Sequence, residues 1–168
     1  RDLGIGMVFQ HFSLFETLSV VENIALTIQG PKKDLIDRIR MIGADYQLEI
    51  DPTAMVNSLS VGQRQRVEII RCLMQDLKLL ILDEPTSVLP PQHVQALFDA
   101  LRKLQNDGVA ILYISHKLEE IRELCDVATI LRDGKVTGKV DPNKTSAQEL
   151  ATLMIGRSIP KIERRESD

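Results

Sequence analysis

The stretch that decides the fold begins Leu59-Ser60-Val61-Gly62-Gln63-Arg64-Gln65-Arg66 and ends Leu79-Leu80-Ile81-Leu82-Asp83-Glu84-Pro85-Thr86. Its first part combines Ser60, a small polar residue suited to begin a helix, with Gly62, which lets a backbone N–H come close to a ligand. Its middle part carries apolar residues at helical spacing, namely Val67, Ile70, Leu73 and Met74. Its last part is a short apolar run that ends in two adjacent carboxylates. A buried parallel strand delivers acidic groups to the carboxyl edge of a sheet in this way.

Both ends of this stretch favour phosphate chemistry. The first turn of a helix has N–H groups without intrahelical partners, and together with the helix dipole these groups favour an anion. The adjacent carboxylates of Asp83 and Glu84 suit a divalent cation and a water to be activated. Asp83 could instead only cap the following turn. Against this alternative, two carboxylates at a buried edge repel each other, and a divalent cation relieves the repulsion.

Composition excludes several other classes. The chain has 168 residues, 43% of them hydrophobic, which is enough for one core in a domain of ordinary size. Its net charge of −3 argues against a general binder of nucleic acids or anionic membranes. No apolar run approaches the roughly 20 residues of a membrane helix, so any work at a membrane would pass through a partner. Cys72 and Cys125 fit no metal or redox spacing, and we interpret them as buried thiols in a reducing cytosol.

The rest of the chain alternates strands and helices, which predicts an α/β fold. Residues 16–75 are interpreted as a mainly helical subdomain, preceded by a core segment at 1–15 and followed by the rest of the core at 76–158 and a charged, loose tail at 159–168. Strands are expected at 5–9, 79–82 and 109–115, the last one buried, and Asp133-Gly134 predicts a tight hairpin between strands at 127–131 and 135–140. Helices are expected to begin at Ser19, to span 34–43, to begin at Pro91, to span 117–125 and to run from Ser146 to about residue 155.

Four short motifs of the chain, two of them in the stretch quoted above, together resemble those of the ATP-binding-cassette (ABC) ATPase family. Leu59-Ser60-Val61-Gly62-Gln63 resembles its signature motif, and the run from Leu79 to Glu84 resembles its Walker B strand. His116, after an apolar strand, resembles its switch histidine, and Gln10, after Gly6-Met7-Val8-Phe9, resembles its Q-loop glutamine. The four occur in the family's order over most of the chain.

The resemblance implies a P-loop NTPase-like sheet core with an inserted α-helical subdomain. It also implies that ATP and Mg²⁺ are the ligands. By resemblance Asp83 and Gln10 hold Mg²⁺, and Glu84 is the general base or orients the attacking water. His116 would sense the γ-phosphate, although a lone histidine at a strand end is usually structural. The signature residues Ser60, Val61, Gly62 and Gln63 would contact ATP held by a second cassette, whereas on their own Ser60 and Gly62 could be just a helix cap and a spacer.

The family's arrangement implies a head-to-tail pair of cassettes under membrane permease subunits, at the cytoplasmic face of the cell membrane. A solute-binding protein would take part indirectly, and no nucleic acid is expected. The exposed apolar loop with Phe12 and Phe15 would border the permease; the alternative interpretation is that these rings only pack on the helical layer. The sequence from Leu59 to Glu68, together with Leu153-Met154-Ile155-Gly156-Arg157, is similar to the first cassette of tandem-cassette importers for sugars or nucleosides. A soluble cassette acting in translation or DNA repair, and a binding module without catalysis, are the alternatives.

The sequence also departs from the family pattern. The phosphate-binding loop G-x-x-x-x-G-K-[ST] does not occur in these 168 residues, so we expect the Walker A part upstream of Arg1, a core truncated at its N-terminus, and no ATPase activity in the isolated chain. Val61 replaces the usual second glycine of the signature, and Pro90 stands where an aspartate is common. Val61 narrows the backbone angles available at its position, and Pro90 alters the segment to which the family's contacts between cassettes are usually credited. His11 and His93 are interpreted as surface residues.

Overall fold

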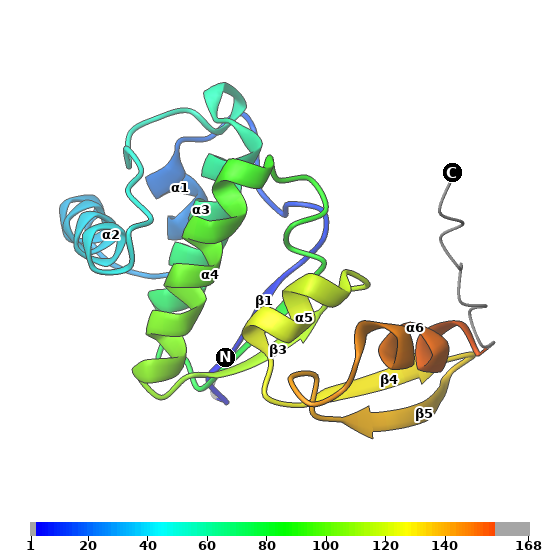
Figure 1. Cartoon of the computed structure of the whole chain (residues 1–168). Coiled ribbons are helices and arrows are strands. Elements are labelled where there is room, and N and C mark those ends of the chain that lie inside the picture. The colour runs from blue at the N-terminus through cyan, green and yellow to red at the C-terminus, as the bar shows by residue number, and fades with distance from the viewer. Residues whose placement is uncertain (1–2, 157–168) are drawn as a thin grey trace. The chain divides into compact units, whose positions relative to one another are not determined.

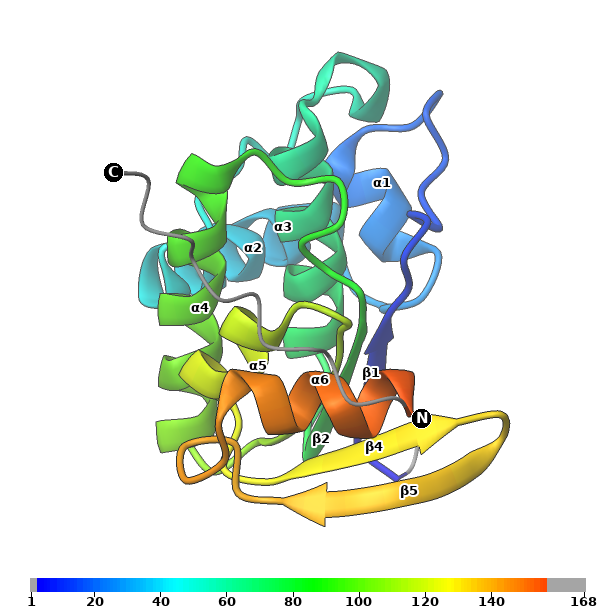
Figure 2. The same ribbon diagram turned by 45° about the vertical axis from the view of Figure 1, so that its right-hand side comes forward.

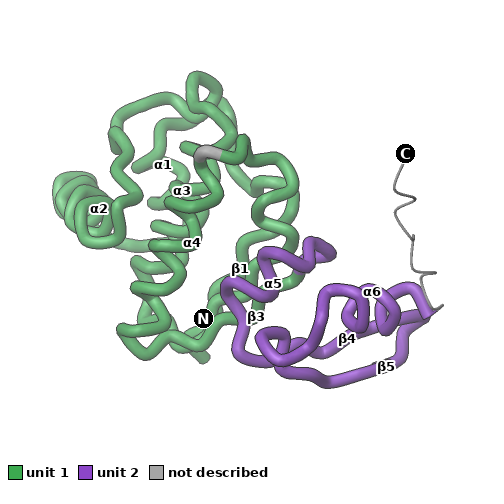
Figure 3. The backbone as a smooth tube through the Cα atoms, viewed as in Figure 1, with its two compact units in different colours: residues 1–114 green, residues 115–168 purple. Residues whose placement is uncertain are grey.

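The computed structural model describes residues 3–156, apart from the side chain of Gln92 (Figure 1). The chain forms two compact units, residues 1–114 and residues 115–168, shown in different colours in Figure 3. The tail predicted at 159–168 lies outside the described residues. In the described part of the chain, no helix is both long and apolar enough to cross a membrane.

The first unit contains a three-stranded parallel sheet. Its strands are β1 (Ile5–Val8), β2 (Leu79–Asp83) and β3 (Ala110–Ile114), in the order β1-β2-β3. In the register of the sheet, Val8 lies beside Leu82, and Asp83 lies beside Ile114. Because all three strands run the same way, their carboxyl ends meet at one edge of the sheet.

Only one face of this sheet is covered by helices of the first unit. Val8, Leu80 and Leu82 on that face are at most 1% exposed, and helices α3 (Val61–Leu73) and α4 (Pro91–Asn106) contact β1 and β3 there. On the opposite face Leu112 is 51% exposed and Ile114 43% exposed. The prediction that residues 109–115 form a buried strand is therefore wrong. The reason is that, within the described residues, β3 lies at the edge of the sheet and its residues alternate between the helix-covered face and the exposed one.

The segment between β1 and β2 is helical, as predicted. It holds α1 (Val20–Ala25), α2 (Lys32–Tyr46), a short 3-10 helix (Val56–Ser58) and α3. The helix start predicted at Ser19 is confirmed by a capping box, in which Ser19 N–H donates to Glu22 Oε2 at 2.9 Å and Glu22 N–H donates back to Ser19 Oγ at 3.4 Å. Helix α2 continues through Gly43, where its end was expected, and stops at Gln47, whose left-handed backbone (φ 56°) ends the helix.

The second unit is a helix followed by a hairpin and another helix. It contains α5 (Leu118–Leu124), the antiparallel strands β4 (Ala128–Arg132) and β5 (Lys135–Val140), and α6 (Ala147–Ile155), which lies along the hairpin (Figure 2). Asp133 and Gly134 both have positive φ, 50° and 73°, as the predicted tight hairpin turn requires. The helix predicted from Ser146 is confirmed, with a capping box to Glu149.

Candidate functional site

Two of the four family-like motifs meet at the carboxyl edge of the parallel sheet. Asp83 is the last residue of β2 and Glu84 follows it, and both side chains are half-buried. Gln10 follows the end of β1 by two residues and is exposed. Since Val8 and Leu82 are neighbours in the register, the structure brings the Gln10 segment and the two carboxylates to the same edge.

Glu84 has a backbone conformation that L-residues rarely adopt. Its φ is 45°, in the left-handed region, where a non-glycine residue is uncommon and concentrates at functional sites. Its N–H donates to the carbonyl oxygen of Ile114 at 2.9 Å, and its own carbonyl accepts from Ser87 N–H at 3.1 Å. These hydrogen bonds turn the chain sharply away from β2 directly after Asp83.

The signature residues form the N-terminal end of α3, a helix of 13 residues. Ser60 caps it through a capping box: Gln63 N–H donates to Ser60 Oγ at 3.3 Å, and Ser60 N–H donates to Gln63 Oε1 at 2.9 Å. Ser60, Val61 and Gln63 are exposed, so this helix end reaches the surface of the first unit. The first N–H groups of a helix have no intrahelical acceptor, which makes an exposed helix start of this kind able to contact an anion.

Packing does not require a glycine at position 62. A Cβ there would lie 3.6 Å from the ring of His93 and 3.7 Å from Leu89 Cδ2, which is ordinary van der Waals contact. His93 is thus half-buried beside the signature and not the surface residue expected, whereas His11 is exposed. Val61 adopts the helical backbone at the first position of α3, and Pro90 takes the cap position of α4, where it makes no side-chain capping bond.

Comparison with known proteins identifies the family. The model of the family described as ABC transporter matches residues 1–87, half of the chain. This chain belongs to the ABC transporter family. Its fold agrees with cbiO1 from Clostridium perfringens, described as part of the ABC transporter complex cbiONQ, with a TM-score of 0.73 and 27% identity over 92% of this chain and 62% of that one. The family and the α/β P-loop NTPase-like fold predicted from the sequence are confirmed.

Several curated relatives within the ABC transporter family are longer import proteins. The glucose import ATP-binding protein TsgD13 of Haloferax volcanii is 38% identical and aligns with 94% of this chain and 35% of its own length. The nucleoside import ATP-binding protein NupA of Lactococcus lactis is 41% identical, and the alignment covers 96% of this chain and 33% of NupA. The ribose import ATP-binding protein RbsA 1 of Streptomyces avermitilis is 43% identical, and the alignment covers 98% of this chain and 32% of RbsA 1. The chain therefore spans about a third of the length of these relatives.

Sequence reasoning missed three buried polar residues beside the ABC motifs. Gln65 is 4% exposed and donates from Nε2 to the carbonyl oxygen of Pro85 at 2.7 Å, which ties α3 to the segment after Glu84. Glu68 is 1% exposed and Asn23 is 2% exposed, and both bind the segment that follows Gln10. Gln65 and Glu68 lie on the same buried face of α3 as Ile69 and Cys72. Polar residues at the spacing of an apolar helix face are the sequence signal that could have identified these two.

The residues at the sheet edge fit Mg²⁺ as the ABC family uses it. Mg²⁺ keeps several waters and is bound through one or two carboxylates and the phosphates of a nucleotide, so it needs no cage of protein ligands. Asp83 would supply a carboxylate and Gln10, on the same edge, an amide oxygen. Within residues 3–156, no group of three or more His, Cys, Asp or Glu side chains could hold a metal by itself.

The predicted switch histidine belongs to the second unit. His116 follows the last residue of β3 by two positions and is exposed. Its neighbours are fixed at the start of α5: Lys117 N–H donates to Ser115 Oγ at 3.1 Å, and Ser115 Oγ donates to Glu120 Oε2 at 3.1 Å. Gln10, Asp83 and Glu84 thus lie at the same sheet edge of the first unit, whereas His116 belongs to the second unit.

Proposed function

We propose that this chain is part of the ATP-binding and ATP-hydrolysing subunit of an ABC transporter that imports a small solute, a sugar or a nucleoside. The observation that carries the proposal is the sheet register, which sets Asp83 and Glu84 on the same edge as the Gln10 segment. The printed functions of the relatives, import of glucose, nucleoside and ribose, support the solute class.

At the sheet edge, Asp83 and Gln10 would hold Mg²⁺, and Glu84 would orient or deprotonate the attacking water. The metal would neutralise charge on the β- and γ-phosphates when nucleotide is bound. Glu84 is half-buried, and its backbone is fixed by the hydrogen bond to Ile114, which suits a side chain that must hold one orientation. His116 would contact the γ-phosphate and report its presence.

Ser60, Val61, Gly62 and Gln63 would contact ATP held by a second cassette in a head-to-tail pair. Two observations support this role. The helix end is exposed on its own unit, and the glycine at position 62 is not explained by packing. A small residue at an exposed helix start lets backbone N–H groups approach phosphate closely.

We place the permease contact at the loop after Gln10, on the cytoplasmic face of the membrane, with a solute-binding protein acting indirectly. Phe15 is 60% exposed although it is a large aromatic residue. Its backbone is held by Asn23, which accepts from Phe15 N–H at 2.8 Å and donates to Phe15 O at 3.0 Å. A rigid backbone that presents an exposed ring suits an anchor for a partner. In this assignment residues 1–15 and 76–158 belong to the ATP-binding core, and 16–75 form the helical subdomain.

The test is ATP-dependent solute uptake in vesicles that contain the full-length protein with its permease. Glu84→Gln should abolish uptake while the complex still assembles and binds nucleotide. Phe15→Ala should weaken assembly and leave ATP binding by the separated subunit intact. If ATP is turned over but neither sugars nor nucleosides are transported, the proposed solute class is wrong. If the wild-type protein does not turn over ATP, the proposed ATPase activity is wrong.

A further inference from the structure

The loop that carries Gln10 is attached at both ends to one turn of helix α3. We call residues 9–12 the Gln10 loop. Upstream of it, a Cβ at Gly6 would lie 3.0 Å from Cys72 Cβ and 2.8 Å from Leu77 Cδ1, so β1 approaches α3 this closely only because residue 6 is glycine. The Cys72 thiol donates to the carbonyl oxygen of Met7 at 3.8 Å, and burial raises the pKa of this thiol to about 11, which keeps the donor protonated at neutral pH.

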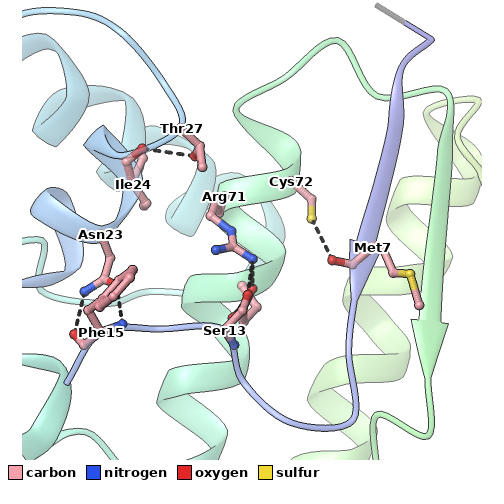
Figure 4. Close-up of polar contacts among 9 residues, drawn as sticks. Met7, Ser13, Phe15, Asn23, Ile24, Thr27, Arg71 and Cys72 are labelled. Atoms are coloured by element: carbon pink, nitrogen blue, oxygen red, sulfur yellow. Dashed lines mark hydrogen bonds and ion pairs between the residues drawn. The ribbon is translucent and has the colours of Figure 1, made fainter. Parts of the chain in front are cut away.

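The downstream attachment is a buried carboxylate. Glu68 Oε1 accepts from Ser13 N–H at 2.8 Å and from Ser13 Oγ at 3.2 Å, although the two residues are 55 positions apart in the sequence. The Arg71 guanidinium pairs with Glu68 Oε2 and also donates to Ser13 Oγ at 2.8 Å (Figure 4). Ser13 is exposed as a residue, and its amide N–H is held by the Glu68 carboxylate.

The energetics favour keeping this attachment closed. If Ser13 moved away, Glu68 would lose two hydrogen bonds while its side chain stayed in a site where it is 1% exposed. A buried charge that loses partners is strongly unfavourable, because the desolvation cost remains when the interactions are gone. The Gln10 loop therefore follows any movement of α3. Glu68 and Cys72 are four residues apart on this helix, so the two attachments move as one rigid turn.

Between the two attachments the loop is open to solvent. Phe9, Gln10 and His11 are exposed, and Phe12 is half-buried. The Gln10 side chain is thus presented by a short segment whose ends are both fixed to the helix that begins at Ser60. One helix connects the residue expected at the metal with the residue expected at the partner's nucleotide.

We propose that Glu68 is a positioning residue: it fixes the Gln10 loop to α3, so that the position of the signature helix sets the position of Gln10. The consequence for turnover rests on the proposed function of Gln10 in holding Mg²⁺. The attachment itself rests only on the contacts between Ser13, Glu68 and Arg71.

The attachment is tested by amide hydrogen exchange on the full-length protein without nucleotide. Glu68→Ala should raise the exchange rate of the Ser13 amide about tenfold or more, since this amide loses its charged acceptor. The Phe15 amide, held by Asn23, should change less, and Asn23→Ala should reverse the pattern. Asp99→Ala is the matched control, because it removes the exposed ion pair to Arg102 with the same i,i+3 spacing as Glu68 and Arg71. An unchanged Ser13 amide in Glu68→Ala would overturn the proposal.

The second readout is steady-state ATP turnover. Glu68→Ala should lower kcat about 10- to 100-fold, as expected when a group that orients metal or water is displaced, with a smaller change in KM for ATP. Glu68→Gln keeps an acceptor oxygen for Ser13 and should restore most of the turnover and of the amide protection. Exchange that rises with kcat unchanged would reduce Glu68 to a structural residue and overturn its positioning role. If the wild-type protein has no ATPase activity, the proposed function fails, and the exchange pattern of Ser13 against Phe15 alone decides whether Glu68 fixes the loop.

Discussion

The backbone N–H of Glu84 donates a 2.9 Å hydrogen bond to the carbonyl oxygen of Ile114, which joins the first residue after β2 to the last residue of β3. The bond fixes Glu84 in its left-handed conformation, with φ 45°. The geometry of this strand end is therefore set by the backbone, and a change confined to the Glu84 side chain should leave it intact.

Glu84→Gln, made in a protein that also contains the phosphate-binding loop, should retain nucleotide binding and lose turnover. Glutamine has the shape of glutamate but cannot accept a proton, so hydrolysis should fall by at least the roughly 10²-fold that a general base contributes. Steady-state ATPase assays and nucleotide titration are the measurements, with the exposed Glu49→Gln as the control. Near-normal turnover would remove Glu84 from the role of base.

Gly62→Ala should separate the needs of the fold from those of the ligand. The added Cβ meets only ordinary contacts, and alanine is favoured over glycine in a helix by up to about 1 kcal/mol, so the free energy of unfolding should stay equal or rise slightly. Nucleotide-dependent pairing and turnover should nevertheless fall, because the methyl group holds phosphate away from the helix start. Urea unfolding and ATPase assays measure the two effects. Turnover equal to wild type would mean that no ligand approaches Gly62 closely.

The 168 residues alone should not bind ATP tightly. A phosphate-binding loop supplies a cradle of N–H groups, a lysine for the β- and γ-phosphates and a hydroxyl for Mg²⁺, and this sequence contains no such loop. Each hydrogen bond to a charged group contributes about 1.5–3 kcal/mol, so the loss of three or four could remove the roughly 6–8 kcal/mol of a micromolar-range site. Titration with a fluorescent ATP analogue and Mg²⁺ is the measurement. Saturable binding below about 10 μM would show another phosphate anchor.

Stability should depend on pH through the capping box of α1. Hydrogen bonds from the side chain and backbone of Ser19, and then from Lys32, lower the pKa of Glu22 from 4.5 to about 2. A lowered folded-state pKa means that this contribution is fully present above the unfolded-state pKa and is lost as the pH falls through about 2. The difference in unfolding free energy between wild type and Glu22→Gln should thus be constant above about pH 5 and shrink toward pH 2.

Urea unfolding at a series of pH values measures this difference. In a Ser19→Ala background, Glu22→Gln should have a much weaker pH dependence, because the main cause of the lowered pKa is gone. If the difference in unfolding free energy between wild type and Glu22→Gln does not vary with pH, protonation of Glu22 is not coupled to folding and the prediction is wrong.

Local patterns were sufficient to predict the element starts and the strand-end carboxylates. Ser19, Ser60 and Ser146 each begin a helix because a small polar side chain followed three residues later by Glu or Gln satisfies its first N–H groups. Asp83 ends its strand directly after a run of four apolar residues, Leu79 to Leu82, where the first of two carboxylates appears. These signals depend on residues close together in the sequence.

Long-range contacts could not be predicted in this way. Glu68 looks like an ordinary polar residue of an amphipathic helix until Ser13, from a distant part of the chain, is placed against it. The φ of Glu84 likewise depends on Ile114, which belongs to another strand.

The parallel pairing of Ile5 with Leu79 has a consequence for the order of folding during synthesis. Leu79 follows Ile5 by 74 positions, which corresponds to about 4–15 s at a ribosomal rate of roughly 5–20 residues per second. Helices α1, α2 and α3 lie wholly within this interval, so they can form before Leu79 is available to pair with Ile5. The sheet edge that carries Asp83 and Glu84 therefore closes only after the helices between β1 and β2 have been synthesised.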